Sequence, residues 1–387
     1  MASPLIYIIA GDPSGDRLAA RLMASLIAQT NGQVRFTGVG GSEMEKLDFK
    51  SLFPMSDLTV MGLAEVLPRL PNLLRRIKET VSSIIKEKPD AVVTIDAPDF
   101  SLRVAKRVAD KNIPLIHLVA PSVWAWKPGR ARKIAPLLDH LMTLLPFEPP
   151  YFEKEGLAST FVGHSVIESG ADQGDGAAFR ARHSIPANAK VLCVLPGSRH
   201  GEINRLLPVM REAIERMAIN DLHIVLPTIQ AVEDEVQKVV TTWPQVVTLV
   251  TGDTEKFDAF AASNAAIAAS GTVALELALA RVPHVIVYKF NALTAIIARR
   301  LVKTPYVNLT NILLNREAVP ELIQEKCRGD IAASHISRYL ADDEAAKEQI
   351  ESFDQAISKL QDGDELPSVR AARVVLDIIQ QRAKLAS

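Results

Sequence analysis

Carboxylates follow two apolar runs in the first part of the chain, and these side chains are suited to proton transfer. Asp96 comes directly after the run 91–95, and Asp99 follows it across a proline that restricts the turn. Asp12 lies just beyond the run 5–10. A carboxylate held at a strand end can remove a proton from a sugar hydroxyl group. Asp96, Asp12 and Asp99 are therefore candidate catalytic residues, and for Asp99 the alternative is a simple helix cap.

The segment 11–16 reads Gly-Asp-Pro-Ser-Gly-Asp and predicts a tight turn leading into a helix from about residue 17. Glycines permit close approach of the backbone, and a helix N-terminus offers free N–H groups to an oxygen-rich ligand. The alternative is an ordinary turn in which Asp16 caps the helix. The spacing matches neither the dinucleotide-binding glycine pattern nor a Walker A loop.

A second group of candidates follows the apolar run 191–195 and suits a diphosphate. Gly197 and Ser198 belong to a small turn, Arg199 adds a planar guanidinium, and Glu202 follows one turn later. Backbone N–H groups and a guanidinium fork can together bind phosphate oxygens. The alternative is a surface arginine in an ordinary turn.

A third group follows the apolar run 265–269. Ser270, Gly271 and Thr272 open a predicted helix, which indicates a second anion site. Glu276 lies one turn inside that helix and can accept hydrogen bonds from ribose hydroxyl groups. The alternative for Glu276 is a solvated helix residue.

Two of the three tryptophans, Trp124 and Trp126, lie in the segment 121–127. Aromatic faces at a strand end suit a sugar ring or an acyl chain, but tryptophan more often packs in a core. The sequence slightly favours the packing role.

Several other kinds of site are excluded. The chain has no Gly-x-Ser-x-Gly motif, and neither Cys193 nor Cys327 has a plausible histidine partner nearby in sequence, so hydrolase triads have no support. The two distant cysteines exclude a disulfide framework, a zinc ribbon and a CxxC redox site. The histidines are scattered, so a histidine-rich metal site is not expected.

The candidates need a scaffold that brings strand ends together, and the apolar pattern predicts one. Short apolar runs alternate with helical patterns, which is typical of buried parallel strands with helical crossovers. The predicted strands are 5–10, 33–37, 91–95, 114–119, 140–144 and 159–162 in the first half, and 191–195, 223–226, 246–250, 265–268 and 284–288 in the second. This pattern predicts two α/β sheets, and in such sheets ligands bind beyond the carboxyl ends of the strands.

Domain boundaries follow from the same pattern. The segment 163–186 indicates a linker with one helix, and three helices are predicted near the end of the chain. We predict an N-terminal domain over 1–165, a C-terminal domain over 166–365 and a last helix over 366–387. That helix need not belong to the domain beside it in sequence.

Length and charge narrow the class of protein. The length of 387 residues predicts two domains, with three as the alternative, and 44 basic against 45 acidic side chains give a formal charge of −1. This balance argues against a nucleic-acid partner. The N-terminus lacks the basic region of a signal peptide, and no apolar run reaches the roughly 20 residues of a membrane span. We therefore expect a cytoplasmic protein, for which contact with a membrane surface stays open.

The segment 58–85 is the main candidate for such contact, because apolar and basic residues alternate in it. The apolar ones are Val66, Leu67, Leu70, Leu73, Leu74 and Ile77, and the basic ones are Arg69, Arg75, Arg76 and Lys78. Pro68 and Pro71 predict a bent or two-part element. The alternative is an amphipathic helix whose apolar face lies in the core. A second candidate is the segment 293–303.

Taken together, the motifs resemble those of lipid-A-disaccharide synthase over nearly the whole chain. The motifs that carry the resemblance are Gly-Asp-Pro-Ser-Gly-Asp at 11–16, Ile-Asp-Ala-Pro-Asp-Phe at 95–100, Pro-Ser-Val-Trp-Ala-Trp at 121–126, Leu-Pro-Phe-Glu at 145–148, Val-Gly-His at 162–164, Leu-Pro-Gly-Ser-Arg at 195–199, Ala-Ser-Gly-Thr at 269–272 and Asn311-Ile-Leu-Leu. Each motif alone is weak, whereas their order and spacing are highly specific.

The resemblance implies a GT-B glycosyltransferase with two Rossmann-like domains whose parallel sheets face a central cleft. It implies an inverting transfer of 2,3-diacylglucosamine from its UDP derivative to 2,3-diacylglucosamine 1-phosphate (lipid X) in lipid A biosynthesis of Gram-negative bacteria. The first domain would face the acceptor and the membrane, and the second would bind the UDP-sugar. No metal or other cofactor is implied, and a homodimer with exchanged C-terminal segments is a further implication.

By position, Asp96 matches the acidic residue that the family needs, and Arg199 and Asn311 match polar residues of its site. The sequence departs from the family where Asp12 replaces the usual glutamate, which leaves the role of Asp12 open. A UDP-sugar 2-epimerase of the same fold is the alternative enzyme. An exported small-ligand binding protein is the non-enzymatic alternative, and the missing signal peptide counts against it.

Overall fold

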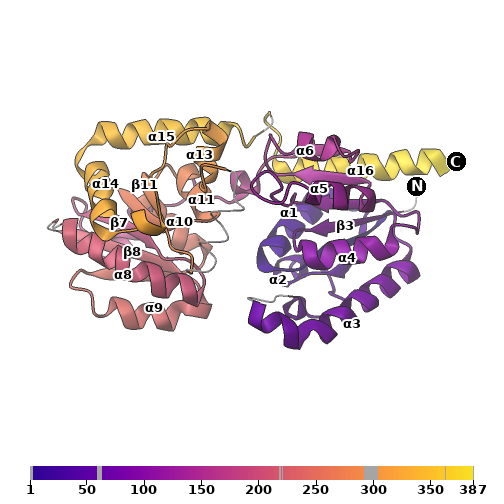
Figure 1. The fold of residues 1–387 in the computed structure, drawn as a ribbon, viewed down its shortest axis with the longest axis horizontal. Coiled ribbons are helices and arrows are strands. Elements are labelled where there is room, and N and C mark those ends of the chain that lie inside the picture. Colours follow the sequence, from indigo (N-terminus) through magenta and orange to yellow (C-terminus); the bar gives the residue numbers. More distant parts are fainter. Residues whose placement is uncertain are drawn as a thin grey trace. The chain divides into compact units, whose positions relative to one another are not determined.

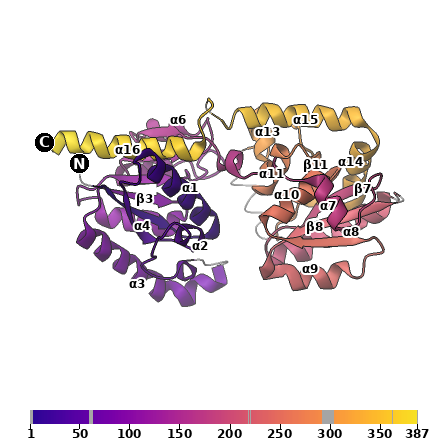
Figure 2. The ribbon, with the colours of Figure 1, turned by 180° about the vertical axis from the view of Figure 1, so that it is seen from behind.

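The chain forms two compact units, each built around one parallel sheet (Figures 1 and 2). The computed structural model describes residues 3–58, 63–217, 219, 221–291, 304–361 and 363–386, with only the backbone for 63–69 and 386. The first unit comprises Met1–Ser165 and Leu360–Ser387, and the second comprises Val166–Lys359.

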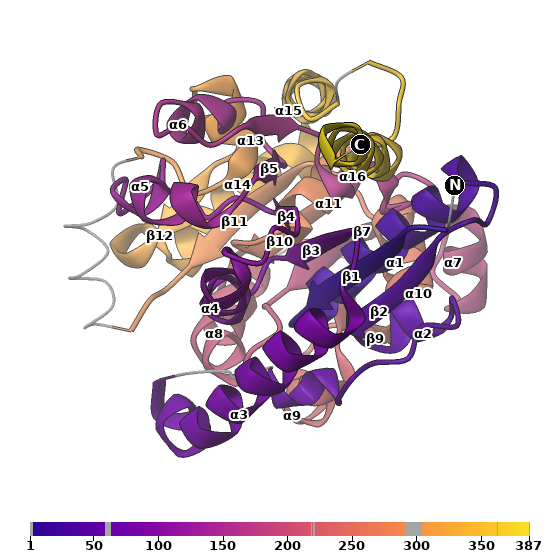
Figure 3. The ribbon, with the colours of Figure 1, turned by 90° about the vertical axis from the view of Figure 1, so that its right-hand side faces the viewer.

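The first sheet has six parallel strands in the order β2-β1-β3-β4-β5-β6. Figure 3 shows β2, β1, β3, β4 and β5 in this order. The strands are β1 (Leu5–Ala10), β2 (Arg35–Val39), β3 (Ala91–Ile95), β4 (Leu115–Leu118), β5 (His140–Thr143) and β6 (Ser159–Phe161). Ala10 pairs with Ile95, and Ile95 pairs with Leu118, so β1, β3 and β4 end at the same edge. The segments that follow these three strands are therefore neighbours.

Helices cover both faces of this sheet, which explains why its strands are apolar throughout. The helices are α1 (Pro13–Gln29), α2 (Ser42–Glu45), α3 (Leu63–Glu87), α4 (Pro98–Val108), α5 (Arg130–Ile134), α6 (Pro149–Glu153) and α16 (Pro367–Ala386). Buried side chains of α3, α4, α5 and α6 share one core cluster with the sheet, and those of α1, α2 and α16 share the other. Successive strand residues alternate between the two clusters, as expected for a period of two.

The last helix, α16, packs along α1 although more than 330 residues separate them in sequence. Ser25 Oγ donates a hydrogen bond to Ser368 Oγ over 2.9 Å, and Gln29 Nε2 donates one to the carbonyl oxygen of Val369 over 2.7 Å. Ala372 and Val375 are fully buried in the same core cluster as α1. The helix that ends the chain therefore belongs to the first unit.

The second sheet has six parallel strands in the order β12-β11-β10-β7-β8-β9. The strands are β7 (Lys190–Leu195), β8 (Leu222–Thr228), β9 (Val247–Thr251), β10 (Ala265–Ala269), β11 (His284–Tyr288) and β12 (Glu321–Ile323). The helices are α7 (Gly176–Arg182), α8 (His200–Met217), α9 (Glu233–Val240), α10 (Asp253–Ala262), α11 (Val273–Leu279), α13 (Leu309–Leu314), α14 (Gly329–Ala341) and α15 (Asp343–Ser358). Helices α8, α9 and α14 cover one face, and α7, α10, α11 and α15 cover the other.

The predicted α/β class with two parallel sheets is confirmed, with local differences. Strand β2 lies two residues later than predicted, because Val39, beyond the predicted end, pairs with Ile9 and is fully buried. Strand β12 was not predicted, since it has three residues and begins with a glutamate. Helix α1 begins at Pro13 rather than near residue 17, because Asp12 caps it.

Helix α3 runs without interruption from Leu63 to Glu87, so the predicted break at Pro68 and Pro71 is wrong. Each proline removes one N–H donor from the helix. The lost bonds fall in the amino-terminal part of the helix, whereas Ile77 and Ile84 hold the later turns in the core.

Candidate active site

Asp12 and Asp96 lie beside each other at the carboxyl edge of the first sheet. Asp12 caps α1, since its Oδ1 accepts a hydrogen bond from the N–H of Gly15 over 2.8 Å and its Oδ2 accepts one from Ser14 Oγ over 2.6 Å. A Cβ atom on Gly11 would lie 2.6 Å from the Cβ of Ala97, so the two turns are in close contact. The structure thus brings two of the predicted catalytic carboxylates together.

Asp96 has the environment expected of a general base. Burial, and next the charge of Asp12, raise the pKa of Asp96, while a hydrogen bond from the backbone of Ala97 opposes this shift. Asp96 and Ala97 both have left-handed backbone conformations, with φ of +46° and +43°. Such strained positions persist only where the surrounding structure holds them, and they are frequent at active sites.

Asp99 stands apart from this pair. It is exposed in the first turn of α4, but the cap position of that helix is Ala97 and no side chain caps it, so the alternative of a helix cap at Asp99 is wrong. The structure therefore favours Asp96 over Asp99 for proton transfer.

The alternative interpretation of the turn, in which Asp16 caps α1, is wrong, because Asp12 caps the helix. The buried carboxylate of Asp16 accepts hydrogen bonds from the backbone N–H groups of Gly41, Glu43 and Met44, over 2.8, 2.9 and 3.3 Å. These N–H groups belong to the beginning of α2, so Asp16 connects α1 to α2. A pairing between residues 25 positions apart is not visible in the local sequence.

The turn after β7 presents an exposed guanidinium. Gly197 has φ of +104°, and a Cβ atom there would lie 2.4 Å from Glu202 Oε2, so this position requires glycine. The Arg199 side chain is 69% exposed and lies 3.5 Å from Glu202 Oε1. This weak pairing leaves Arg199 available to an anionic ligand.

Glu202 stabilises this turn through hydrogen bonds with Ser198 and Tyr288. Its Oε2 accepts a hydrogen bond from the N–H of Ser198 over 3.2 Å, and its Oε1 accepts one from the hydroxyl group of Tyr288 over 3.1 Å. Tyr288 ends β11 and was not recognised as a site residue from the sequence. Glu202 thus holds the turn and does not point freely into solvent.

Ser270, Gly271 and Thr272 follow β10, which lies between β7 and β11, so they share an edge with the Arg199 turn. Helix α11 begins at Val273, as the sequence predicted within a residue or two. Glu276 is paired with Lys256, whose Nζ lies 3.0 Å from Glu276 Oε2 and 2.9 Å from Asp253 Oδ1. Lys256 is a second residue that the sequence did not single out.

Asn311 has a structural role in this conformation. Its Nδ2 donates hydrogen bonds to the carbonyl of Val319 and to Glu321, and its Oδ1 accepts from the N–H groups of Ala318 and Val319. An amide has two donors and two acceptor positions, so every one is used inside the protein. Asn311 is also fully buried, and it holds the segment that leads into β12.

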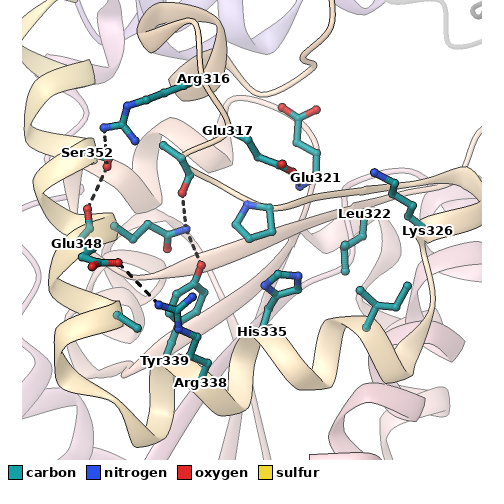
Figure 4. Close-up of a pocket in the computed structure, with 15 residues that line it drawn as sticks. Arg316, Glu317, Glu321, Leu322, Lys326, His335, Arg338, Tyr339, Glu348 and Ser352 are labelled. Atoms are coloured by element: carbon teal, nitrogen blue, oxygen red, sulfur yellow. Dashed lines mark hydrogen bonds and ion pairs between the residues drawn. The ribbon is translucent and has the colours of Figure 1, made fainter.

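A cavity of about 580 Å³ lies elsewhere in the second unit, against α14, α15 and the segment before β12 (Figure 4). It has charged walls of both signs, including the pair Arg338–Glu348 at 3.7 Å. None of the residues predicted for catalysis or UDP binding lines it.

The described part of the chain contains neither a metal-binding cluster nor a membrane-spanning helix. No group of three or more His, Cys, Asp or Glu side chains there could hold a metal ion. No helix in the described ranges is long and apolar enough to cross a membrane.

Two doubly wound parallel sheets, each with polar residues beyond its strand ends, define an α/β protein of the GT-B class. Solved structures share this fold: UDP-GlcNAc 2-epimerase from Neisseria meningitidis bound to UDP-GlcNAc has a TM-score of 0.62 at 12% identity, covering 97% of this chain and 99% of that one. The calicheamicin glycosyltransferase has a TM-score of 0.61 at 15% identity, covering 98% of this chain and 99% of that one.

Sequence comparison distinguishes between these two classes of enzyme. The family model described as lipid-A-disaccharide synthetase matches residues 6–374. The lipid-A-disaccharide synthase of Rhodospirillum centenum is 53% identical over 382 residues, which cover 98% of this chain and 95% of that protein. The chain belongs to the lipid-A-disaccharide synthetase family. The predicted glycosyltransferase function is thereby confirmed over the epimerase alternative.

Proposed function

We propose that this protein transfers 2,3-diacylglucosamine from its UDP derivative to lipid X, giving the β-1,6-linked disaccharide 1-phosphate and UDP with inversion at the anomeric carbon. The observation that carries this proposal is family membership combined with a raised-pKa carboxylate at the edge of the first sheet. An exposed guanidinium at the edge of the second sheet supports it.

On the acceptor side, Asp96 acts as the general base. Its carboxylate removes the proton of the acceptor 6-hydroxyl group as that oxygen attacks the anomeric carbon. The raised proton affinity of Asp96 suits this task better than that of an ordinary exposed aspartate. Asp12 maintains this environment through its negative charge and holds the beginning of α1.

On the donor side, the turn Gly197–Ser198 and Arg199 bind the diphosphate of UDP. Negative charge grows on the leaving phosphate as the glycosidic bond breaks, and a fixed guanidinium stabilises it. Protein groups take this role in the proposal, which needs no cofactor. Ser270, Gly271 and Thr272 complete the nucleotide site, and Glu276 binds the ribose after exchange of its contact with Lys256.

The direct test is to mix the diacyl donor with lipid X and measure released UDP. We expect UDP and a disaccharide 1-phosphate in equal amounts, and no turnover of UDP-N-acetylglucosamine alone. Folded protein that releases no UDP from intact substrates would refute the proposal. Conversion of UDP-N-acetylglucosamine without an acceptor would instead support the epimerase.

We also propose that the protein works at the cytoplasmic face of the inner membrane and docks through α3, because both substrates carry acyl chains. Leu74 and Ile85 are 43% and 44% exposed on this helix, and Arg75 and Lys78 are exposed beside them. Basic residues next to apolar ones suit an anionic leaflet.

Other members of the predicted patch serve the core instead. Ile77 is fully buried, and Leu73 packs partly against the same cluster. Arg76 lies 2.6 Å from Glu79, also pairs with Asp57, and stacks over Phe53. The side chains of 63–69 and the second candidate patch at 293–303 lie outside the described residues.

Exchanging Leu74 and Ile85 together for serine should weaken binding to anionic vesicles at least about tenfold. Each large aliphatic side chain that leaves water contributes roughly 1.5–3 kcal/mol. Sedimentation with phosphatidylglycerol vesicles measures the effect, and Leu366→Ser, at a leucine 49% exposed elsewhere on this unit, is the matched control. Equal binding by the double variant and the control would place the docking site elsewhere.

A further inference from the structure

Glu148 is a buried carboxylate beyond the end of β5. It is 3% exposed, and burial raises its pKa to about 7. Within the described part of the chain, no lysine, arginine or histidine side chain pairs with it. Such a group is costly unless hydrogen bonds hold it, so its presence requires an explanation.

Three N–H donors surround Glu148 and come from two strand ends. Trp124 Nε1 donates to Oε1 over 3.1 Å, and the backbone N–H of Leu145 donates to Oε2 over 3.0 Å. The backbone of Leu144 supplies a further hydrogen bond. Trp124 follows β4 and Glu148 follows β5, so the carboxylate ties together the segments beyond two adjacent strands.

The segment that Glu148 ties down is under strain where it leaves the sheet. Val119 has φ of +81°, which is costly for a β-branched residue. Val123 is buried in the core beneath the segment, and the Trp124 ring packs edge-on against Phe147 with centroids 5.3 Å apart. The packing and the hydrogen bond to Glu148 together give Trp124 a fixed orientation.

Trp126 and Lys127, just beyond, are presented to solvent. Trp126 is 38% exposed, and Lys127 Nζ lies 4.4 Å from the centre of its ring. No carboxylate of the described residues pairs with Lys127. An aromatic face suits a sugar ring and an ammonium group suits a phosphate. The strand before this segment, β4, adjoins β3, whose end carries Asp96.

We propose that Glu148 is a positioning residue that, by holding Trp124, fixes the segment 121–127 as the platform for a sugar 1-phosphate acceptor. The ring of Trp126 packs on the acceptor and Lys127 binds its phosphate. The inference rests on the proposed function for the identity of the acceptor, but its test does not depend on turnover.

The test measures binding of lipid X in mixed micelles, and separately of UDP, by calorimetry. Glu148→Gln places an NH₂ group against a backbone N–H group, and Trp124→Phe removes the indole donor while keeping a smaller aromatic ring against Phe147. Both variants should bind lipid X about 10- to 100-fold more weakly, the penalty typical of a displaced positioning group, with unchanged affinity for UDP. The double variant should lose little more than either single one, because both changes break the same contact. Glu153→Gln, at an exposed glutamate of α6, is the matched control.

Turnover gives the second readout. In active enzyme the two variants should raise the KM for lipid X and leave the KM for the UDP-sugar unchanged. Wild-type protein that binds lipid X but releases no UDP would refute the proposed function, while loss of that binding in the variants would still support the role of Glu148. Lipid X affinity within twofold of wild type in Trp124→Phe would overturn the inference. So would an equal loss of UDP affinity, because that would indicate a general structural defect. If Glu148→Gln does not fold, Trp124→Phe decides alone.

Discussion

Asp96→Asn should lower kcat by at least about 100-fold, since general-base assistance typically contributes 10²–10⁴ in rate. Asparagine tolerates the left-handed backbone that Asp96 adopts, so the fold should persist. The affinity for UDP should change little, because Asp96 lies in the first unit, whereas the residues proposed to bind UDP lie in the second. Steady-state kinetics together with UDP calorimetry would check both expectations.

The pH profile adds an independent check on Asp96. A base must be ionised, so activity is present above its pKa and is lost as the pH falls through it. Because burial and Asp12 raise the pKa of Asp96, the acid limb of kcat/KM should lie above that of an ordinary aspartate. Asp99→Asn is the matched control, because it removes the same charge from an exposed aspartate three residues along the chain, and it should leave the rate and the pH profile nearly unchanged. Near-normal turnover in Asp96→Asn would assign the base to Asp99 or Asp12.

Arg199→Ala is the second large effect that we expect. Loss of a preorganised donor to a developing charge typically costs about 10²–10³ in rate, and this variant should also weaken UDP binding. The side chain is largely exposed and only weakly paired with Glu202, so its removal should cost little stability. Calorimetry with UDP and steady-state kinetics would measure the two losses.

Lysine should rescue Arg199 poorly, because an ammonium group cannot reproduce the two parallel donors of a guanidinium. Arg216→Ala, at the far end of α8, where the arginine pairs with Glu212, is the control for loss of a surface charge. Unchanged UDP affinity in Arg199→Ala would contradict the proposed diphosphate site.

The strands were the most predictable part of the fold. Runs such as 5–10 and 91–95 are apolar at every position because helices cover both faces of the sheet. Elements that depend on contacts with segments distant in sequence were less predictable. Strand β12 is recognisable only through its pairing with β11, and α3 continues through two prolines because core contacts hold its later turns.

The residues of the candidate site could likewise be predicted in part. The family, the residue types at the strand ends and the positions of Asp96 and Arg199 just beyond buried strands could all be predicted from the sequence. A residue that comes just after a predicted parallel strand must lie at the carboxyl edge of the sheet, so these positions follow from the local apolar pattern.

The surroundings of each group could not be predicted, because they arise from packing between distant segments. The tertiary structure placed Asp12 beside Asp96, paired Glu276 with Lys256, enclosed the amide of Asn311 and held the indole of Trp124 on Glu148. These contacts join residues that are distant in sequence, and the burial that shifts the pKa values of Asp96 and Glu148 arises only when the sheet and its helices pack together.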